Sequence, residues 1–250
     1  MARFPAALAE RAASLLVLLV VWEATARIAH SRLFPGVGTV LATLVDDALH
    51  GELLHDLGAT LVRVAVAFTL AMAAGTALGI AMARSRAIDT LLDSGVVLLL
   101  NLPALVIAVL LYIWLGLTEA AAIGAVTLSK LPAVVVTLRE GARTLDRDLA
   151  DMARSFHFGR WRTFRHVTLP QLSPYFLIAS RTGLSLIWKI VLVVELLGRP
   201  DGIGYAIQVF FQLFDVRRLI AYALAFVAVV LAVEWGVLQP LERRLARWRR

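Results

Sequence analysis

The sequence predicts an all-α membrane protein with six transmembrane helices. Of its 250 residues 60% are hydrophobic, and its mean hydropathy is +0.80, whereas soluble globular domains are only about half apolar. A helix that crosses a hydrocarbon core of about 30 Å needs roughly 20 mostly apolar residues. Six windows meet this requirement, namely 12–29, 60–83, 92–115, 119–138, 172–197 and 217–238. Together they make the chain a single membrane domain.

The first window follows Arg3 and Arg11 and begins with AASLLVLLVV, so it has the charge and hydropathy of a signal sequence. The apolar run continues through Trp22 and Glu23 without a small-x-small cleavage site. We therefore interpret residues 1–30 as an uncleaved first span.

The connection over residues 31–58 carries a short amphipathic pattern. Its apolar residues recur at helical spacing, opposite acidic and polar ones. The apolar set is Val40, Leu41, Leu44, Val45, Ala48 and Leu49, and the polar set is Asp46, Asp47, His50 and Glu52. Such a helix either lies in the outer membrane interface or packs on the bundle as an extracytoplasmic helix.

Basic residues fall on alternate connections, and such residues favour the cytoplasmic side. One side carries Arg3, Arg11, Arg84, Arg86, Arg139, Arg143, Arg147, Arg154, Arg160, Arg162, Arg165 and the tail from Arg243. Both termini are therefore expected to be cytoplasmic, with Arg217 and Arg218 on the outer side as exceptions. On this basis residues 59–240 form a core of five spans with a cytoplasmic loop at 139–171, and residues 241–250 form a basic cytoplasmic tail.

The sequence lacks the motifs of several kinds of catalytic and nucleotide-binding site. The chain has no cysteine, and neither of its two lysines, Lys130 and Lys189, follows a glycine as a phosphate-binding loop requires. The metalloprotease motif H-E-x-x-H and the hydrolase motif G-x-S-x-G are also missing from the sequence. The net charge of +7 lies in the clusters that set topology, which argues against a nucleic-acid surface.

The segment 148–170 is a polar, arginine-rich interruption between apolar windows. Residues 148–158 form a short amphipathic helix by spacing, which Gly159 is expected to break. A second helix with Trp161 and Phe164 is expected to end at Leu169-Pro170. The apolar face of this hairpin either meets a partner or packs on the chain's own bundle.

This segment resembles the EAA loop of ABC importer permeases. Asp151-Met152-Ala153 stands at the acidic-small-small position, and Val167-Thr168-Leu169-Pro170 closes the motif. The resemblance runs from about Leu33 to Tyr205 and is similar to the nitrate, taurine and alkanesulfonate branch. Two residues depart from the pattern, because Met152 is bulkier than the usual small residue and His157 stands where the family has glycine. The bend is accordingly expected at His157 or, instead, at Gly159.

The resemblance implies a type I ABC importer permease fold in a bacterial inner membrane. It implies two cytoplasmic ATPase subunits that bind ATP and Mg, an extracytoplasmic solute-binding protein, and a second permease subunit that is either identical or different. Surrounding lipid is a further partner, and no cofactor is expected in this chain. The substrate class is a small anion such as a sulfonate, taurine or nitrate. The coupling residues would be Asp151, Met152, Ala153, Arg154, Phe156, His157, Phe158, Gly159, Trp161, Leu169 and Pro170.

Ionisable residues inside spans are costly and by default face the bundle interior or a water-filled path. Lys130 and Lys189 lie about 11 and 9 residues from the ends of their windows, which at 1.5 Å per residue is near mid-depth. Both are candidates for an anion path, although each could instead pair with an acidic residue such as Glu195, Glu23 or Glu234. Glu195 joins the candidates because its VVELLG segment matches a recurrent acidic position of the resembled branch.

Two further expectations concern side chains and mechanism. Arg63 and Arg181 lie nearer the span ends and are expected to extend to the interface. A secondary transporter that works without an ATPase is the main alternative to an importer, but it would normally show internal repeats, which the sequence lacks.

Overall fold

The computed structural model describes residues 3–238 and 240, and every regular element among them is helical. The predicted tail at 241–250 lies outside this part of the chain. The elements are α1 (Arg3–Ala29), α2 (Val37–Leu49), α3 (Leu53–Arg84), α4 (Arg86–Asn101), α5 (Ala104–Leu115), α6 (Glu119–Arg143), α7 (Arg147–Ser155), α8 (Arg160–Thr163), the π-helical turn η1 (Phe164–Thr168), α9 (Leu169–Gly198), α10 (Ile203–Gln212), α11 (Val216–Val233) and the π-helical turn η2 (Glu234–Leu238).

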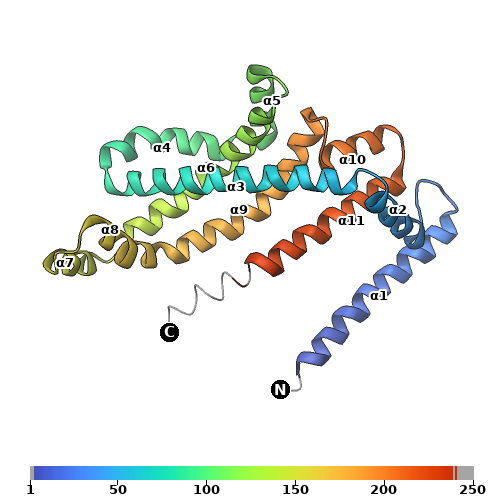
Figure 1. Ribbon diagram of the computed structural model, residues 1–250, viewed down its shortest axis with the longest axis horizontal. Helices are drawn as coiled ribbons and strands as arrows, with labels where there is room; N and C mark the ends of the chain where they lie inside the picture. Colours follow the sequence, from blue (N-terminus) through green and yellow to red (C-terminus); the bar gives the residue numbers. More distant parts are fainter. Residues whose placement is uncertain (1–2, 239, 241–250) are drawn as a thin grey trace.

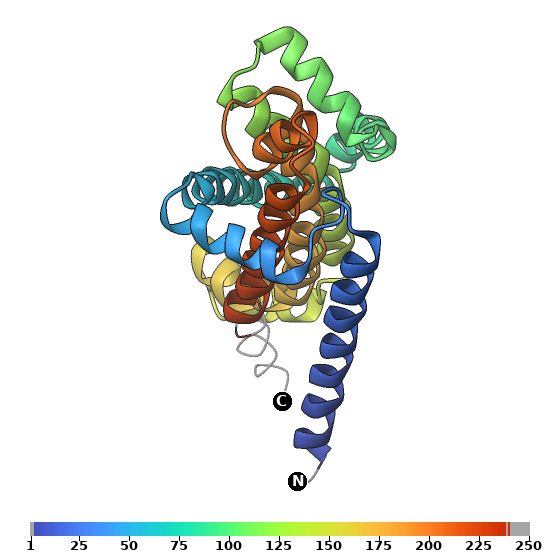
Figure 2. The same cartoon turned by 90° about the vertical axis from the view of Figure 1, so that its right-hand side faces the viewer.

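The core of the bundle consists of α3, α6 and α9, which pack against one another along much of their length. Small residues allow the close approach of α3 to α6. A Cβ atom at Gly75 would lie 2.7 Å from Val134, and one at Gly79 would lie 2.7 Å from the carbonyl oxygen of Val135. Figures 1 and 2 show α1 leading away from this bundle, and Figure 1 shows α7 and α8 projecting at the end far from α2 and α10.

Four helices of the described chain are long and apolar enough to cross a bilayer: Leu53–Arg84, Glu119–Arg143, Arg160–Gly198 and Val216–Gly236. A fifth crossing results if α4 and α5 are counted together as one bent pair. The prediction of six spans thus stays a prediction. The first expected span lies in α1, where the side chains from Leu15 to Val21 are largely exposed.

The expectation of one helix over 92–115 is wrong. The axes of α4 and α5 meet at 103°. Leu102 has an extended backbone with ψ of 126°, as the residue before a proline prefers, and Pro103 cannot donate the hydrogen bond that would continue the helix. A hydropathy average does not register this break, because apolar residues stand on both sides of it.

The amphipathic segment is helical and packs on the bundle against α11. Val40 is fully buried there, while Leu41, Val45 and Leu49 on other faces are exposed. Asp47 was expected on the polar face, but it is buried and accepts a hydrogen bond of 3.1 Å from Nε of Arg218. The ion pair fixes the start of α11 to α2.

Candidate functional site

The first arm of the hairpin is α7, and its end differs from the sequence expectation. The amide of His157 donates to the carbonyl of Arg154 (3.0 Å) and the amide of Phe158 donates to that of Ala153 (2.9 Å). This is the two-bond helix end that normally uses a left-handed glycine, and His157 adopts it with φ of +53°. Gly159 has an extended backbone, with φ of −63° and ψ of 157°. The bend therefore lies at His157, and the alternative bend at Gly159 is wrong.

The second arm does not end at Leu169-Pro170 as expected. It continues through the π turn η1 directly into α9, so that Arg160–Gly198 is one helical run of 39 residues. The amide of Leu169 donates to the carbonyl of Phe164 five residues earlier. Pro170, which has no amide hydrogen, then falls in the first turn of α9. A proline is tolerated at that position, and a π turn is the usual way to insert one extra residue into a helix.

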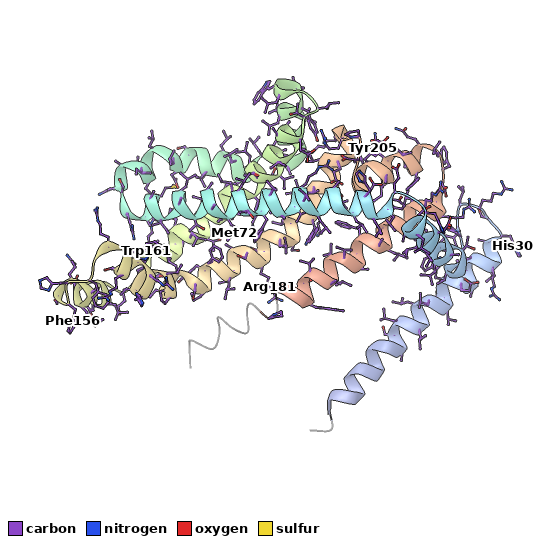
Figure 3. All side chains as sticks on the ribbon, viewed as in Figure 1. His30, Met72, Phe156, Trp161, Arg181 and Tyr205 are labelled. Carbon is purple, nitrogen blue, oxygen red and sulfur yellow. The ribbon has the colours of Figure 1, made fainter. Side chains whose placement is uncertain are left out.

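The tip of the hairpin exposes large apolar side chains. Phe156 and Trp161 are each 71% exposed, and Met152 is 44% exposed. Figure 3 shows Phe156 and Trp161 at the end of the molecule farthest from His30. Ala153, in contrast, is fully buried. Because α7 contacts η1, Ala153 is buried inside the hairpin, while the aromatic tip is left uncovered by this chain.

Three other residues of the hairpin are placed differently from these exposed apolar side chains. Phe158 is half-buried, with the guanidinium of Arg162 5.5 Å from its ring centroid. Asp151 and Arg154 form an exposed ion pair with each other on α7. The surface available to a partner is thus Met152, Phe156 and Trp161, rimmed by this pair.

A second polar site lies at the opposite end of the bundle, around Arg63 of α3. Its Nη1 donates to Oε1 of Glu195 (2.8 Å) on α9, and its Nε donates to Oε1 of Glu119 (2.7 Å) at the start of α6. Its Nη2 also donates to Asp201, in the connection between α9 and α10. Arg63 is only 3% exposed and Glu195 is 0% exposed. The expectation that Arg63 extends to the interface is wrong.

The remaining groups of this Arg63 network hold the connection that follows α9. The second oxygen of Glu195 accepts hydrogen bonds from the Thr60 hydroxyl and the Gly204 amide, each 2.9 Å long. The Gly202 amide donates to Asp56 (2.8 Å). Gly202 has φ of +101°, and a Cβ atom there would lie 2.6 Å from Glu195. Only glycine fits this conformation and contact.

The three candidate substrate-path residues are not brought together. Glu195 is enclosed in the Arg63 network. Lys130 is 2% exposed and crosses α9 at Gly183, where a Cβ atom would lie 2.7 Å from its Cε. Lys189 is exposed and lines a groove of about 470 Å³ between α9 and α11, together with Arg181 and Glu234.

The ion pair considered between Lys189 and Glu195 does not form, because Glu195 is bonded to Arg63. Within the described part of the chain no carboxylate lies within 4.0 Å of Lys189 or Lys130. Sequence reasoning missed Asp56, Thr60 and Asp201, whose roles depend on contacts with residues more than 130 positions away. The sequence did contain one indication of this site, namely Arg63, an ionisable residue inside the apolar window 60–83.

Comparison with known proteins identifies the family. Residues 75–246 match the model of the binding-protein-dependent transport system inner membrane component. The chain belongs to this family. It is therefore a membrane-embedded transport permease subunit, and the secondary-transporter alternative finds no support in the comparisons.

The relatives share most of their length with this permease. A Bacillus subtilis protein named as an aliphatic sulfonates transport permease is 28% identical and covers 93% of this chain and 85% of its own. Its Escherichia coli namesake is 29% identical over 92% and 88%, and the E. coli taurine transport system permease is 27% identical over 94% and 88%. An amino acid ABC transporter of known structure shares the fold, with a TM-score of 0.61 at 22% identity over 77% of this chain and 93% of that one.

Replacing Arg63 by Gln should destabilise the permease by about 3–5 kcal/mol, because the buried Glu195 carboxylate would lose its counter-charge. The measurement is the thermal unfolding of the detergent-purified protein. Arg154→Gln is the matched control, since its exposed ion pair should contribute at most about 1 kcal/mol. The double variant Arg63→Met/Glu195→Leu should recover part of the loss; equal unfolding temperatures for Arg63→Gln and the control would contradict this account.

Replacing His157 by Gly should stabilise the end of α7 by about 1 kcal/mol, because glycine adopts the left-handed backbone without cost. His157→Val should do the opposite, since a β-branched side chain is strained there. Hydrogen exchange of the Phe158 amide reports on this turn directly. Equal protection of that amide in all three proteins would show that the turn is elsewhere.

Proposed function

We propose that this permease forms the membrane passage of an ATP-driven importer for a small sulfonate-like anion, and that its ATPase subunits bind the hairpin tip formed by Met152, Phe156 and Trp161. The observation that carries the proposal is the exposure of these apolar side chains on a polar, projecting hairpin. Aromatic residues of this kind are the usual energetic anchors of protein interfaces. Asp151 and Arg154 form the polar rim.

The coupling follows from the continuity of the helix behind the hairpin. Arg160–Gly198 is one helical run, and at 1.5 Å per residue it extends about 58 Å. A displacement of Trp161 near its start is therefore transmitted to Glu195 near its end. ATP and Mg are bound by the ATPase partners, and the free energy that they supply is exchanged through the contacts of the hairpin.

The substrate class rests on the names of the relatives, two for aliphatic sulfonates and one for taurine, and on the cationic residues of the spans. Lys189 in its groove and Lys130 beside Gly183 provide positive charge for an anion, while Glu195 holds the Arg63 network in place. An extracytoplasmic solute-binding protein delivers the substrate, and a second permease subunit, identical or different, completes the passage. The site of action is the bacterial inner membrane, with six spans and both termini cytoplasmic.

The double variant Phe156→Ala/Trp161→Ala should retain the ATPase subunit at least tenfold more weakly, because each lost anchor costs more than 1 kcal/mol. Copurification of the coexpressed complex and uptake of taurine into cells measure the two consequences. Phe211→Ala/Trp114→Ala removes the same side chains, 67% and 69% exposed, away from the hairpin and should retain the ATPase normally. Undiminished retention and uptake in the hairpin variant would refute the coupling role.

Replacing Lys189 by Gln should raise the KM for taurine uptake about tenfold or more, because one charge-assisted contact to the anion is lost, while ATPase retention stays unchanged. Arg86→Gln, an exposed residue at the start of α4, is the control of equal charge. If uptake by the Lys189 variant equals that of the control, Lys189 does not line the path.

A further inference from the structure

A polar hollow lies where α1 ends and α11 begins, apart from the hairpin and the Arg63 network. It measures about 860 Å³ and lies between the α1–α2 connection and the α10–α11 connection. Its lining includes His30, Ser31, Arg32 and Phe34 from the first connection, and Phe214 and Arg217 around the second. These residues directly follow α1 and directly precede or begin α11. Because α11 is long and apolar enough to span a bilayer and the hollow lies at its start, the hollow is expected where this span leaves the hydrocarbon, at headgroup level.

Positive charge at the hollow exceeds what the fold uses. Arg218 forms an ion pair with the buried Asp47 and does not line the hollow. Arg217 lies 3.8 Å from Asp215, whose carboxylate also accepts from the Arg218 amide at 3.3 Å. Arg32 is exposed and, among the described residues, has no acidic group within 4.0 Å. The lining thus has two guanidinium groups, of Arg32 and Arg217, but one carboxylate, of Asp215, and carries a net positive charge.

The rim of the hollow is apolar, although it is uncovered. Leu213 is 69% exposed, Phe214 is 74% exposed and Phe34 is 40% exposed, and all three line the hollow. A patch of this kind beside cations matches an amphipathic ligand whose anionic part contacts the arginines and whose hydrocarbon part covers the rim. A soluble acidic protein would neutralise the charge without needing the apolar rim.

Backbone strain is concentrated at the same place. His30 has φ of +44° and Phe214 has φ of +56°, and the one further non-glycine residue with positive φ in the described chain is His157. His30 and Phe214 each terminate a helix, where a glycine would serve without cost. A bulky aromatic residue in this conformation is a true outlier. Backbone strain of this kind is typical of functional sites, where the strained residue is needed for binding or activity.

We propose that this hollow binds the phosphate headgroup of an anionic phospholipid, with Arg32 and Arg217 contacting the phosphate and Phe214 covering the first acyl carbons. Basic pockets between membrane helices recognise anionic lipid headgroups in this way. The proposal requires only that α1 and α11 lie in a bilayer, so it stands apart from the coupling role of the hairpin. It also accounts for arginines that run against the charge distribution of the other connections.

The test uses the full-length permease in nanodiscs that contain phosphatidylcholine with a small fraction of spin-labelled phosphatidylglycerol. We expect the wild-type protein to immobilise the phosphatidylglycerol label, and the Arg32→Gln/Arg217→Gln variant to bind it about fivefold more weakly for each arginine removed. Arg84→Gln/Arg86→Gln removes the same charge at the opposite end of the bundle and should bind as the wild type does. Phe214→Gly should relieve the strained backbone and raise the unfolding temperature, yet weaken lipid binding.

Three outcomes would overturn the proposal. Equal immobilisation of spin-labelled phosphatidylcholine would show that the headgroup charge is not recognised. Displacement of the label by millimolar inorganic phosphate would show a free-anion site in place of a lipid site. Unchanged lipid binding in the Arg32/Arg217 variant, together with lost association of a solute-binding protein, would assign the hollow to that partner.

Discussion

The buried guanidinium of Arg63 is the constraint on which the arrangement of the core depends. A cation taken out of water inside an apolar bundle is tolerated only with close, well-oriented counter-charges. Here Glu119, Glu195 and Asp201 supply them from three different segments. All three carboxylates must contact one planar group. The start of α6, the end of α9 and the connection to α10 are therefore fixed relative to α3. The excess negative charge is offset by Arg199, which lies 2.7 Å from Glu119.

The helical run Arg160–Gly198 joins the hairpin to the Arg63 network. Glu195 is held in the Arg63 network three residues before the end of α9, and Trp161 is exposed near the start of the same helical run. The π turn η1 lies between the hairpin and the apolar part of this run, so the hairpin arm is offset in register from the span. Lys130 and Lys189 lie along the span between these ends, against Gly183 and in the α9–α11 groove. Both lysines therefore lie between the hairpin and the Arg63 network.

Hydropathy and periodicity were sufficient to predict the helical core, because α3, α6, α9 and α11 cover the windows at 60–83, 119–138 and 172–197 and most of that at 217–238. They were insufficient wherever one residue acts through geometry. Pro103 breaks a largely apolar window, and Pro170, which the sequence predicts as a helix end, lies in the first turn of α9 because a π turn precedes it. Arg63 looked like a residue that extends to the interface because its partner Glu195 is 132 positions away. His157 shows that a residue other than glycine can adopt the left-handed backbone conformation at this helix end.

Ion pairing also bears on the exceptions in the charge distribution. Orientation follows the number of Lys and Arg residues and gives nearby Asp and Glu little weight, so an ion pair can explain why an arginine stands on the outer side without changing that count. On the side proposed as outer, Arg199, Arg217 and Arg218 each face a carboxylate within 4.0 Å, whereas Arg32 does not. On the side proposed as cytoplasmic, Arg139 and Arg143 are paired with Asp89, but five further arginines whose side chains the structure describes have no such partner: Arg84, Arg86, Arg160, Arg162 and Arg165. The ion pairs therefore give Arg199, Arg217 and Arg218 a structural reason to be where they are, and the larger number of basic residues on the other side still favours the proposed orientation.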